Sequence, residues 1–326
     1  MLKNAYYKKE TEQETLPNID INIKCGNSLI SRFDLDADLS KALKESKWNI
    51  DSYRIAVDTY RNAQNKEQKR EMEKIIHDIK NDFRSEISSN DPKVKRLQKV
   101  KGELFLLTNQ TQMFEMSKKE KAAWNKKLEK LAKESKKLET EIREIKDNKI
   151  YENAFEWRFE FPDVLDDTGE YVGFDVVIGN PPYIRQEEIK EIKPYLQNNY
   201  KTYTGTADLF VYFVERGISV LRQKGQFVYI LPNKWMRAGY GEKLREFLLE
   251  QNIDSIVDFG DLPVFEEATT YPCILEIAKG KGGSYFKSAE VEKLTFNKGL
   301  ADYLIEGFFE VDSRLLQPNG WTLGGF

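Results

Sequence analysis

The sequence predicts an α/β protein with a mostly parallel, doubly wound sheet, one antiparallel hairpin at the sheet edge and a long helical insertion. Three observations support this class. From residue 151 onward, short apolar runs that end at turn residues alternate with amphipathic helical stretches. The last two runs are joined by a loop too short for a crossover helix, so they should pair antiparallel. Residues 41–149 instead repeat apolar side chains at helical spacing.

Length and composition allow about two domains and argue against a membrane protein or a metalloprotein. The chain has 326 residues, of which 40% are hydrophobic and 32% charged, enough for a buried core. No run of 18 apolar residues exists and the polar N-terminus lacks a signal-peptide core, so we expect a cytoplasmic protein with no membrane partner. Cys25 and Cys273 lie far apart and His77 is the single histidine, so we expect no metal site.

Residues 1–40 are interpreted as the start of the core, and residues 41–150 as a basic helical insertion. Ile19 to Cys25 has the pattern of a short strand that ends in a Gly-Asn-Ser loop. Residues 61–150 hold 24 Lys and Arg against 16 Asp and Glu. Such a basic segment can face a phosphate backbone, although a solvated helix of mixed charge is the commoner explanation. His77 in this insertion is expected to be a surface or helix-packing residue.

Apolar spacing in the insertion predicts one helix followed by an antiparallel helical hairpin. The first set is Met72, Ile75, Ile76, Ile79, Phe83 and Ile87. Asn90-Asp91-Pro92 should end that helix and cap the next. A second set steps by four and three residues: Trp124, Leu128, Leu131, Ser135, Leu138, Ile142 and Ile145. This spacing is typical of helix packing, so the hairpin is interpreted as an inserted arm.

Residues 151–283 carry the alternating elements of the core. Strands are predicted at 174–178, 226–231, 253–259 and 273–278, the last of these ending the sheet. Helices are predicted around 207–222 and 241–251, with Lys224-Gly225 as the C-terminal stop of the first. Residues 284–326 are less regular and are interpreted as a connection toward a further domain.

The most informative segment is Asn-Pro-Pro-Tyr, residues 180–183, directly after the apolar run from Phe174 to Ile178. The prolines fix φ and carry no N–H, so the segment cannot continue a sheet and its carbonyls point outward. Asn180 and the Pro181 carbonyl can accept hydrogen bonds from an exocyclic amino group, and Tyr183 offers a stacking surface. An ordinary turn after a strand is the alternative.

A series of segments between Ile21 and Ala278 resembles the amino-group DNA methyltransferases, most of all the adenine-N6 type of type IIG restriction–modification enzymes. The segments, in order, are Cys-Gly-Asn-Ser-Leu (25–29), Gly-Phe-Asp-Val-Val-Ile-Gly-Asn-Pro-Pro-Tyr (173–183), Asp-Leu-Phe-Val-Tyr-Phe-Val-Glu (208–215), Gly-Gln-Phe-Val-Tyr-Ile-Leu-Pro-Asn-Lys-Trp (225–235), Leu-Arg-Glu-Phe-Leu (244–248), Val-Asp-Phe-Gly (257–260) and Val-Phe-Glu (264–266). Each is weak alone, and their order makes the match specific. The resemblance implies a partial class I methyltransferase (Rossmann-like) sheet, S-adenosyl-L-methionine as cofactor and double-stranded DNA as partner.

The resemblance also implies roles for individual residues. Asn180, Pro181 and Tyr183 would hold the amino group and the flipped base, with Phe265 as a second stacking face. Pro182 and Phe213 would flank the adenine ring of the cofactor, and Asn27 would contact the edge of that ring.

The alternatives for these assignments are packing roles. Phe265 could be a hairpin-packing residue, and Phe213 could face the core together with Leu209 and Ile218.

One departure from the family pattern matters. No Gly-x-Gly-x-x-Gly follows a strand, and only about 20 residues precede the Gly-Asn-Ser strand, too few for the usual cofactor loop. We therefore expect the catalytic region of a larger enzyme, inactive alone. Its partners would be an upstream cofactor loop, a downstream target-recognition domain and any nuclease domain. The strand at 174–178 should then have an unpaired hydrophobic edge.

Two other functions remain open from the sequence. A glutamine-amide methyltransferase acting on release factors also uses Asn-Pro-Pro-Tyr and faces the same problem of a weak amide nucleophile. A non-catalytic DNA-binding or scaffold subunit would also fit a chain without the cofactor loop. Cytosine-N4 and RNA targets are open as well, since the motif grips an amino group rather than a whole base.

Overall fold

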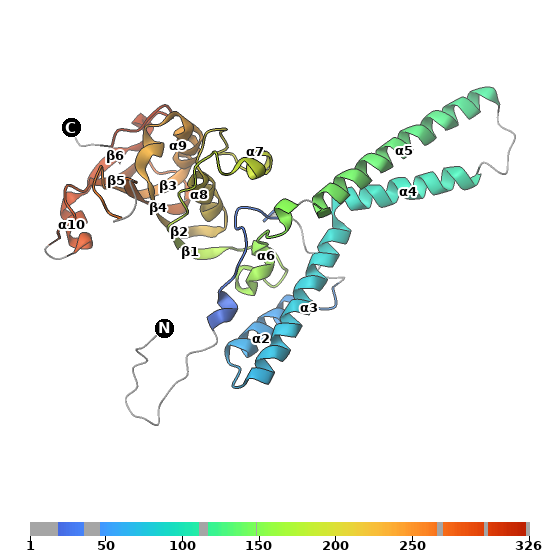
Figure 1. The fold of residues 1–326 in the computed structure, drawn as a ribbon, viewed down its shortest axis with the longest axis horizontal. Helices are drawn as coiled ribbons and strands as arrows, with labels where there is room; N and C mark the ends of the chain where they lie inside the picture. The colour runs from blue at the N-terminus through green and yellow to red at the C-terminus, as the bar shows by residue number, and fades with distance from the viewer. Residues whose placement is uncertain are drawn as a thin grey trace. The chain divides into compact units, whose positions relative to one another are not determined.

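The computed structural model describes residues 19–35, 46–110, 117–147, 149–265, 270–296 and 299–323. The chain divides into two compact units, Met1–Tyr171 and Val172–Phe326, which are drawn in Figure 1. The first unit is helical in its described part and the second is built on a mixed sheet. The expected α/β class with a helical insertion is confirmed.

The described part of the first unit contains four longer helices and several short ones. The longer helices are α2 (Ile50–Arg61), α3 (Lys66–Asn90), α4 (Pro92–Gln110) and α5 (Lys118–Asp147). The short ones are η2 (Ile19–Asn22), η3 (Lys149–Tyr151), α6 (Trp157–Glu160) and η4 (Pro162–Val164). The strand expected over Ile19–Cys25 is wrong: η2 occupies its first half. A strand needs a ladder partner, and Ile19–Cys25 has none in the described part; the single bridge nearby, from Asn27 to Ala154, lies after the segment.

The core of this unit lies where α2 and α3 pack on the segment 159–165. Buried members include Tyr53, Ile79, Phe83 and Phe159. The Tyr53 hydroxyl donates to the Phe159 carbonyl at 2.6 Å, and the Tyr53 ring meets Phe83 edge-on. The helical spacing that predicts α3 therefore marks its packing face. His77 lies on the exposed face, 2.8 Å from the Asn81 amide, as expected for a surface residue.

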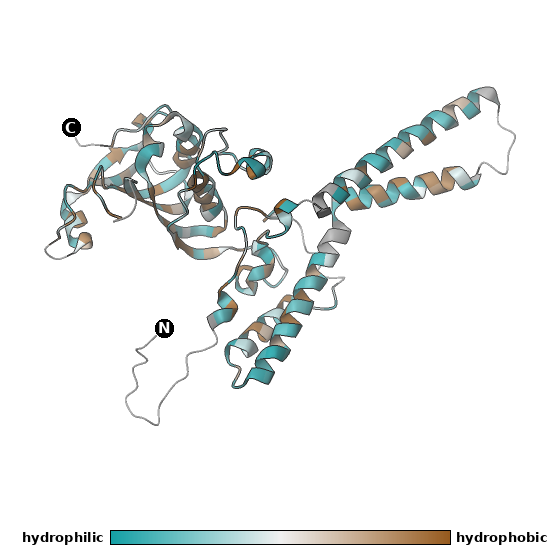
Figure 2. Ribbon diagram, in the orientation of Figure 1, coloured by the Kyte–Doolittle hydropathy of each residue, from teal (hydrophilic) through white to brown (hydrophobic). Residues whose placement is uncertain are grey.

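Helices α4 and α5 form the expected antiparallel hairpin, named here the arm. Asp91 caps α4, since its carboxylate accepts the N–H groups of Lys93 (2.7 Å) and Val94 (3.3 Å). On α5 the predicted packing positions are all buried or half-buried, which confirms the packing stripe: Trp124, Leu128, Leu131, Ser135, Leu138 and Ile142. The side chain of Ile145 lies outside the described residues. Figure 2 shows that the rest of α5 is mainly hydrophilic.

The second unit contains a six-stranded sheet in the order β1-β2-β4-β3-β5-β6. The strands are β1 (Phe174–Gly179), β2 (Leu221–Pro232), β3 (Gln251–Asp258), β4 (Pro272–Lys281), β5 (Tyr285–Glu290) and β6 (Phe309–Asp312). The helices are α7 (Lys193–Asn199), α8 (Leu209–Ser219), α9 (Glu242–Leu249) and α10 (Leu300–Gly307), with short turns η5 (Lys190–Ile192), η6 (Asn233–Met236), η7 (Gly239–Gly241) and η8 (Ser313–Leu315).

The antiparallel pairing of β3 with β4 is confirmed, but this hairpin lies inside the sheet rather than at its edge. β4 pairs antiparallel with both β2 and β3. β5 then adds parallel to β3, and β6 adds antiparallel to β5. The expectation that 273–278 is the last strand is therefore wrong. The sheet continues through β5 and β6, so it is mixed rather than mostly parallel.

The expected helix stop at Lys224-Gly225 is also wrong. Helix α8 ends at Ser219, and Lys224-Gly225 lies within β2. Lys224 has φ of 64°, and the pairing of β1 with β2 shifts register between Phe174 and Val176. A left-handed residue followed by glycine makes an irregularity in a strand as readily as it ends a helix.

The expected exposed edge of the sheet is present. β1 is the first strand in the sheet order and pairs only with β2. Its side chains Val176 and Ile178 are 57% and 78% exposed. An apolar edge strand of this kind offers unpaired backbone groups to another segment.

Candidate active site

The carboxyl ends of three strands meet at one edge of the sheet. β1, β2 and β3 run in the same direction, because β1 is parallel to β2 and β4 is antiparallel to both β2 and β3. They lead into Asn180, Asn233 and Phe259, respectively. Ligands of open α/β sheets bind outside the carboxyl ends of the strands. This edge is the candidate active site.

The Asn-Pro-Pro-Tyr segment leaves β1 as an open turn. Asn180 is exposed and its side chain makes no hydrogen bond within the described part of the chain, while Pro181 is buried and Pro182 is exposed. The Tyr183 hydroxyl donates to the Ile230 carbonyl at 3.3 Å, and burial raises the pKa of Tyr183 to about 12. Tyr183 is thus held neutral against the end of β2, and the amide of Asn180 is available to a ligand.

Two hydrogen bonds attach the segment after Tyr183 to the start of α8. The Asp208 carboxylate accepts the Gln186 N–H at 3.0 Å, and the Leu209 N–H donates to the Ile184 carbonyl at 3.0 Å. Burial raises the pKa of Asp208, and the hydrogen bond from Gln186, which lowers that pKa, offsets only part of the rise. Asp208 directly precedes the apolar helix α8, a position typical of a capping residue, but its carboxylate makes no capping bond to α8 and instead bonds Gln186.

A second link joins the ends of β2 and β3. The Asn233 side-chain amide donates to the Asp258 carboxylate at 2.8 Å and to the Gly260 carbonyl at 3.3 Å. The Gly260 N–H also donates to Asp258, at 3.0 Å. Sequence reasoning missed this link, because it depends on β4 bringing two distant strand ends to the same edge.

The two expected aromatic contacts differ in their surroundings. Phe213 is half-buried, whereas the other hydrophobic side chains of α8 are buried. The alternative that it shares the buried face of Leu209 and Ile218 therefore loses support. Phe265, in the loop after β3, is also half-buried and is not a member of the cluster that Val257, Phe259 and Val291 form there.

Asn27 lies in the other unit, in a tightly held loop. Its side-chain oxygen accepts the Leu29 N–H at 3.2 Å, and its backbone N–H donates to the Asn153 carbonyl at 2.6 Å. The Glu156 carboxylate, which is buried, accepts hydrogen bonds from the Ser31 hydroxyl (2.6 Å) and the Arg32 N–H (3.0 Å). With its oxygen occupied, Asn27 can offer a ligand its amide N–H groups as donors.

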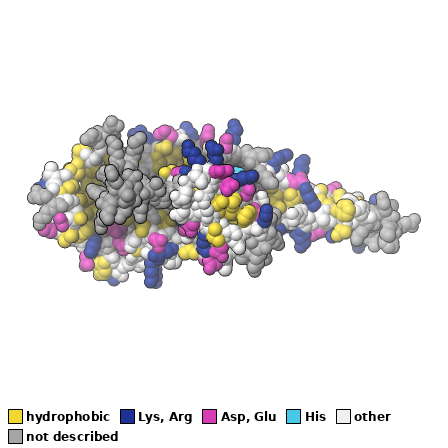
Figure 3. Space-filling model, turned by 90° about the horizontal axis from the view of Figure 1, so that it is seen from below, with side chains coloured by type: hydrophobic (Ala, Val, Ile, Leu, Met, Phe, Trp, Pro, Cys, Tyr) yellow, Lys and Arg dark blue, Asp and Glu magenta, His cyan; other side chains and the backbone are white. Residues whose placement is uncertain are grey.

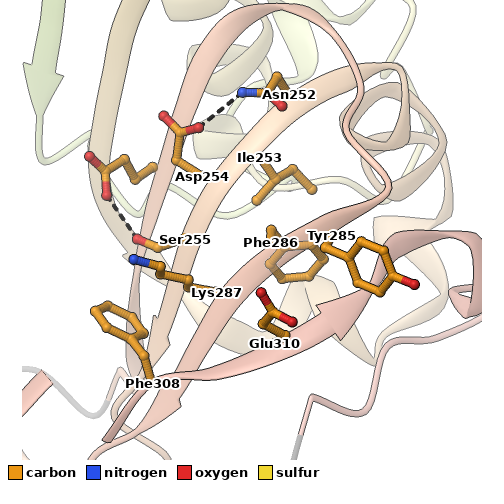
Figure 4. Close-up of a pocket in the computed structure, with 10 residues that line it drawn as sticks. Asn252, Ile253, Asp254, Ser255, Tyr285, Phe286, Lys287, Phe308 and Glu310 are labelled. Atoms are coloured by element: carbon orange, nitrogen blue, oxygen red, sulfur yellow. Dashed lines mark hydrogen bonds between the residues drawn. The ribbon is translucent and has the colours of Figure 1, made fainter. Parts of the chain in front are cut away.

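A cavity of about 420 Å³ opens on β3, β4, β5 and β6, away from the expected site residues. Figure 4 shows Asp254, Lys287 and Glu310 around it. Ser255 donates to Glu276 at 2.8 Å, and Asn252 donates to Asp254 at 3.0 Å. Burial and, less strongly, the nearby Glu276 raise the pKa of Asp254. The polar groups of this cavity thus bond mainly to one another.

Two further findings bear on the class of protein. Within the described residues, no cluster of three or more His, Cys, Asp or Glu side chains could hold a metal ion. None of the helices in the same residues is both long and apolar enough to cross a membrane.

An α/β sheet with an Asn-Pro-Pro-Tyr segment at the carboxyl end of one strand is typical of amino-group methylases. Residues 3–265 match the model of the Eco57I restriction-modification methylase family. The chain belongs to this family. S-adenosylmethionine is the cofactor that membership implies, and the sequence-based family expectation is confirmed.

Similarity to individual relatives covers only part of each. The chain is 33% identical over 158 residues to the type II restriction enzyme and methyltransferase RM.Eco57I of Escherichia coli, which covers 46% of this chain and 15% of that protein. It is 39% identical over 127 residues to the type II methyltransferase M.BstVI of Geobacillus stearothermophilus, covering 38% and 22%, respectively. These matches span about a fifth or less of the relatives' length.

A solved structure gives weaker similarity. The type I restriction-modification methyltransferase subunit from Streptococcus thermophilus aligns with a TM-score of 0.36 and 15% identity, covering 44% of this chain and 35% of that one. A TM-score of this size supports nothing further about the chain.

Proposed function

We propose that this chain is the catalytic part of an enzyme that transfers a methyl group to the N6 amino group of a flipped adenine in DNA, within a restriction–modification enzyme. The observation that carries the proposal is the free amide of Asn180 at the carboxyl end of β1, followed by the buried Pro181 and the anchored Tyr183. Family membership supports a methylase, and the names of the relatives support DNA as its substrate.

The amino nitrogen of adenine is a poor nucleophile, so methyl transfer requires that the enzyme activate it. The lone pair of an adenine amino nitrogen is delocalised into the ring. Hydrogen bonds from its two N–H groups to the Asn180 side-chain oxygen and the Pro181 carbonyl would localise that lone pair and aim it. S-adenosylmethionine, when bound, supplies the electrophilic methyl group. The contribution of Asn180 and Pro181 is alignment and transition-state electrostatics rather than removal of a proton by a strong base.

Stacking residues would hold the base and the cofactor. A flipped base loses its neighbours in the duplex at a cost of a few kcal/mol, which aromatic faces offset. Tyr183 and Phe265 are proposed for the base. The exposed Pro182 and half-buried Phe213 present apolar surface suited to the adenine ring of the cofactor, and Asn27 has free donors for the edge of that ring.

The test is substitution of Asn180 in the protein that contains this chain. We expect Asn180→Ala to reduce methyl transfer to duplex DNA by about 10²- to 10³-fold, the size found for the loss of an oriented catalytic dipole, and to leave DNA binding nearly unchanged. Asn180→Asp is the matched variant, because it keeps the shape and an acceptor oxygen. Near wild-type turnover of Asn180→Ala would contradict the assigned role.

Product analysis separates the candidate substrates. Digestion of methylated DNA to nucleosides should yield N6-methyladenine. N4-methylcytosine would overturn the adenine assignment, and methylation of a release-factor peptide instead of DNA would favour the glutamine-amide alternative. No methyl transfer by the parent enzyme to either substrate would favour the scaffold alternative.

Donor affinity tests the expectation that this chain is inactive alone. The sequence contains no Gly-x-Gly-x-x-Gly after a strand, and such turns bind the cofactor in the family that the chain resembles. We expect calorimetry to detect weak binding of S-adenosylmethionine to the 326-residue chain, or none. Low-micromolar binding would refute that expectation.

A further inference from the structure

The outer face of the arm carries a straight row of lysines. Lys119, Lys126, Lys130, Lys133 and Lys137 of α5 are all exposed; we name them the lysine stripe. They are separated by seven, four, three and four residues. At 3.6 residues per turn these positions fall in a sector about 60° wide, nearly opposite the side that packs on α4. Figure 3 views the arm from the side of α4, where Lys and Arg, acidic and hydrophobic side chains are mixed; the outer face of α5 is turned away in this view.

Of the four acidic residues of α5 whose side chains are described, three form ion pairs on the flanks of its contact with α4. Glu134 pairs with Arg96 (2.7 Å), Glu139 with Lys101 (2.7 Å) and Glu141 with Lys93 (3.0 Å). These pairs draw the acids of α5 toward α4. The lysine stripe on the opposite side keeps its charge.

Little within the described part of the chain neutralises the stripe. Lys126, Lys130 and Lys133 make no ion pair there, and Lys137 makes only a long one, 3.9 Å, to Glu141. Glu129 also lies beside the stripe, four residues before Lys133, and it forms no ion pair among the described residues. The positive charge of the stripe is therefore available to a partner.

We propose that the lysine stripe binds the phosphate backbone of duplex DNA. The proposal rests on the proposed function, which makes DNA the substrate. The stripe is about 27 Å long at 1.5 Å per residue, and duplex DNA presents one charge per about 1.7 Å of its axis. The residues interspersed on this face are Ala122 and Ala123, with no aromatic anchor. A protein partner would need such anchors, and lysine is depleted in protein interfaces.

The arm ends beside a loop of the expected site. Helix α5 is followed by η3 and then by Asn153, whose carbonyl accepts the Asn27 N–H, and by Phe155, whose N–H donates to the carbonyls of Asn27 and Ile30. A DNA contact on the arm is thus mechanically connected to the loop that carries Asn27. Phosphate contacts of this kind fix the position of a duplex without reading its sequence.

The test compares two triple variants that change the charge equally. K126Q/K130Q/K133Q removes the centre of the stripe. K66Q/R70Q/K74Q removes three exposed cations of α3 that make no ion pair in the described part of the chain. Glutamine keeps high helix propensity, and circular dichroism of both variants verifies that the arm folds.

The measurement is the anisotropy of a labelled duplex titrated with the 326-residue chain at several salt concentrations. Each lost phosphate contact lowers the slope of log K against log salt by about 0.9. We expect K126Q/K130Q/K133Q to lower the slope by about 2 to 3 and to weaken binding at least roughly tenfold in 0.1 M salt, with little effect from K66Q/R70Q/K74Q.

Three results overturn the proposal: equal slopes for wild type and K126Q/K130Q/K133Q, equal losses in both triple variants, or no binding of duplex by the wild-type chain. Failure of the proposed function has a separate readout, because it depends on methyl transfer by the parent enzyme and on Asn180. If the stripe binds DNA but the parent enzyme methylates no base, the proposed activity is refuted and the proposed DNA contact of the stripe still holds.

Discussion

Replacement of Trp321 tests whether the C-terminal segment supports the end of β2. The Trp321 side chain is 1% exposed and its ring meets Trp235 edge-on, with centroids 5.3 Å apart. Its backbone N–H donates to the Met236 carbonyl at 2.7 Å. Both partners belong to η6, which begins at Asn233. Trp321→Ala should therefore loosen the turn that carries the bond from Asn233 to Asp258.

The expected loss is about 3–5 kcal/mol in the free energy of unfolding, the range for a buried Trp cut to Ala. Trp321→Phe is the control. It keeps an aromatic contact and removes an indole N–H that is buried without a partner in the described part of the chain. Removal of this unpaired N–H regains the free energy lost by burying it, which offsets part of the packing energy lost with the smaller ring. We therefore expect a cost of only about 1 kcal/mol in the free energy of unfolding.

Hydrogen exchange of peptides from β2 and η6 is the suitable assay, because it reports the second unit separately from the first. A loss of 3–5 kcal/mol corresponds to exchange about 10²- to 4 × 10³-fold faster when exchange follows the opening equilibrium. Acceleration below tenfold in Trp321→Ala, or equal acceleration in Trp321→Phe, would refute the reasoning.

Three other predictions concern single polar groups. Asp91→Ala removes the cap of α4 and should cost about 0.5–2 kcal/mol, seen as faster exchange at Lys93 and Val94; unchanged exchange would contradict the cap. Glu156→Gln should cost about 1–3 kcal/mol in thermal unfolding of the first unit, because the NH₂ of its buried amide would face one of the two groups that now donate to the carboxylate; an unchanged melting temperature would count against it. The pKa of Asp208 is raised in the folded protein, so its contribution to stability is complete below the ordinary Asp pKa and is lost as pH rises through the folded value. Urea unfolding of Asp208→Asn between pH 3.5 and 7 should lack that decline, and parallel pH profiles for both proteins would contradict it.

Elements defined by local patterns could be predicted from the sequence. The stripe that begins at Trp124 requires only knowledge of helical spacing, and Asp91-Pro92 is a helix start that needs no tertiary contact. β1 was readable because an apolar run ends at a motif that excludes a continuing strand. The candidate role of Asn180 could be predicted for the same reason, because it depends on the local motif. Whether the Asn180 side chain is available to a ligand could not be predicted, because that depends on the residues around it.

Elements defined by pairing could not be predicted in the same way. The segment from Ile19 to Cys25 has strand composition, but without a ladder partner it forms η2. β5 and β6 have little apolar alternation, and they become strands because β3 offers a free edge. Lys224-Gly225 is ambiguous in principle, since a positive φ serves both a helix end and an irregular strand. The composition of a segment limits the secondary structures that it can form, and the segments packed beside it determine which one forms.

The candidate site shows why this difference matters for function. Residues 180–183 carry their chemistry in one local segment, whereas Asn233 and Asp258 meet only because β4 runs antiparallel between β2 and β3. The same bond ties the end of β2 to the loop that leads to Phe265. Asn233→Ala should therefore act on the position of Phe265 rather than on the grip at Asn180. In the parent enzyme we expect it to raise KM for DNA more than it lowers kcat, and a fall in kcat alone would refute this division of roles.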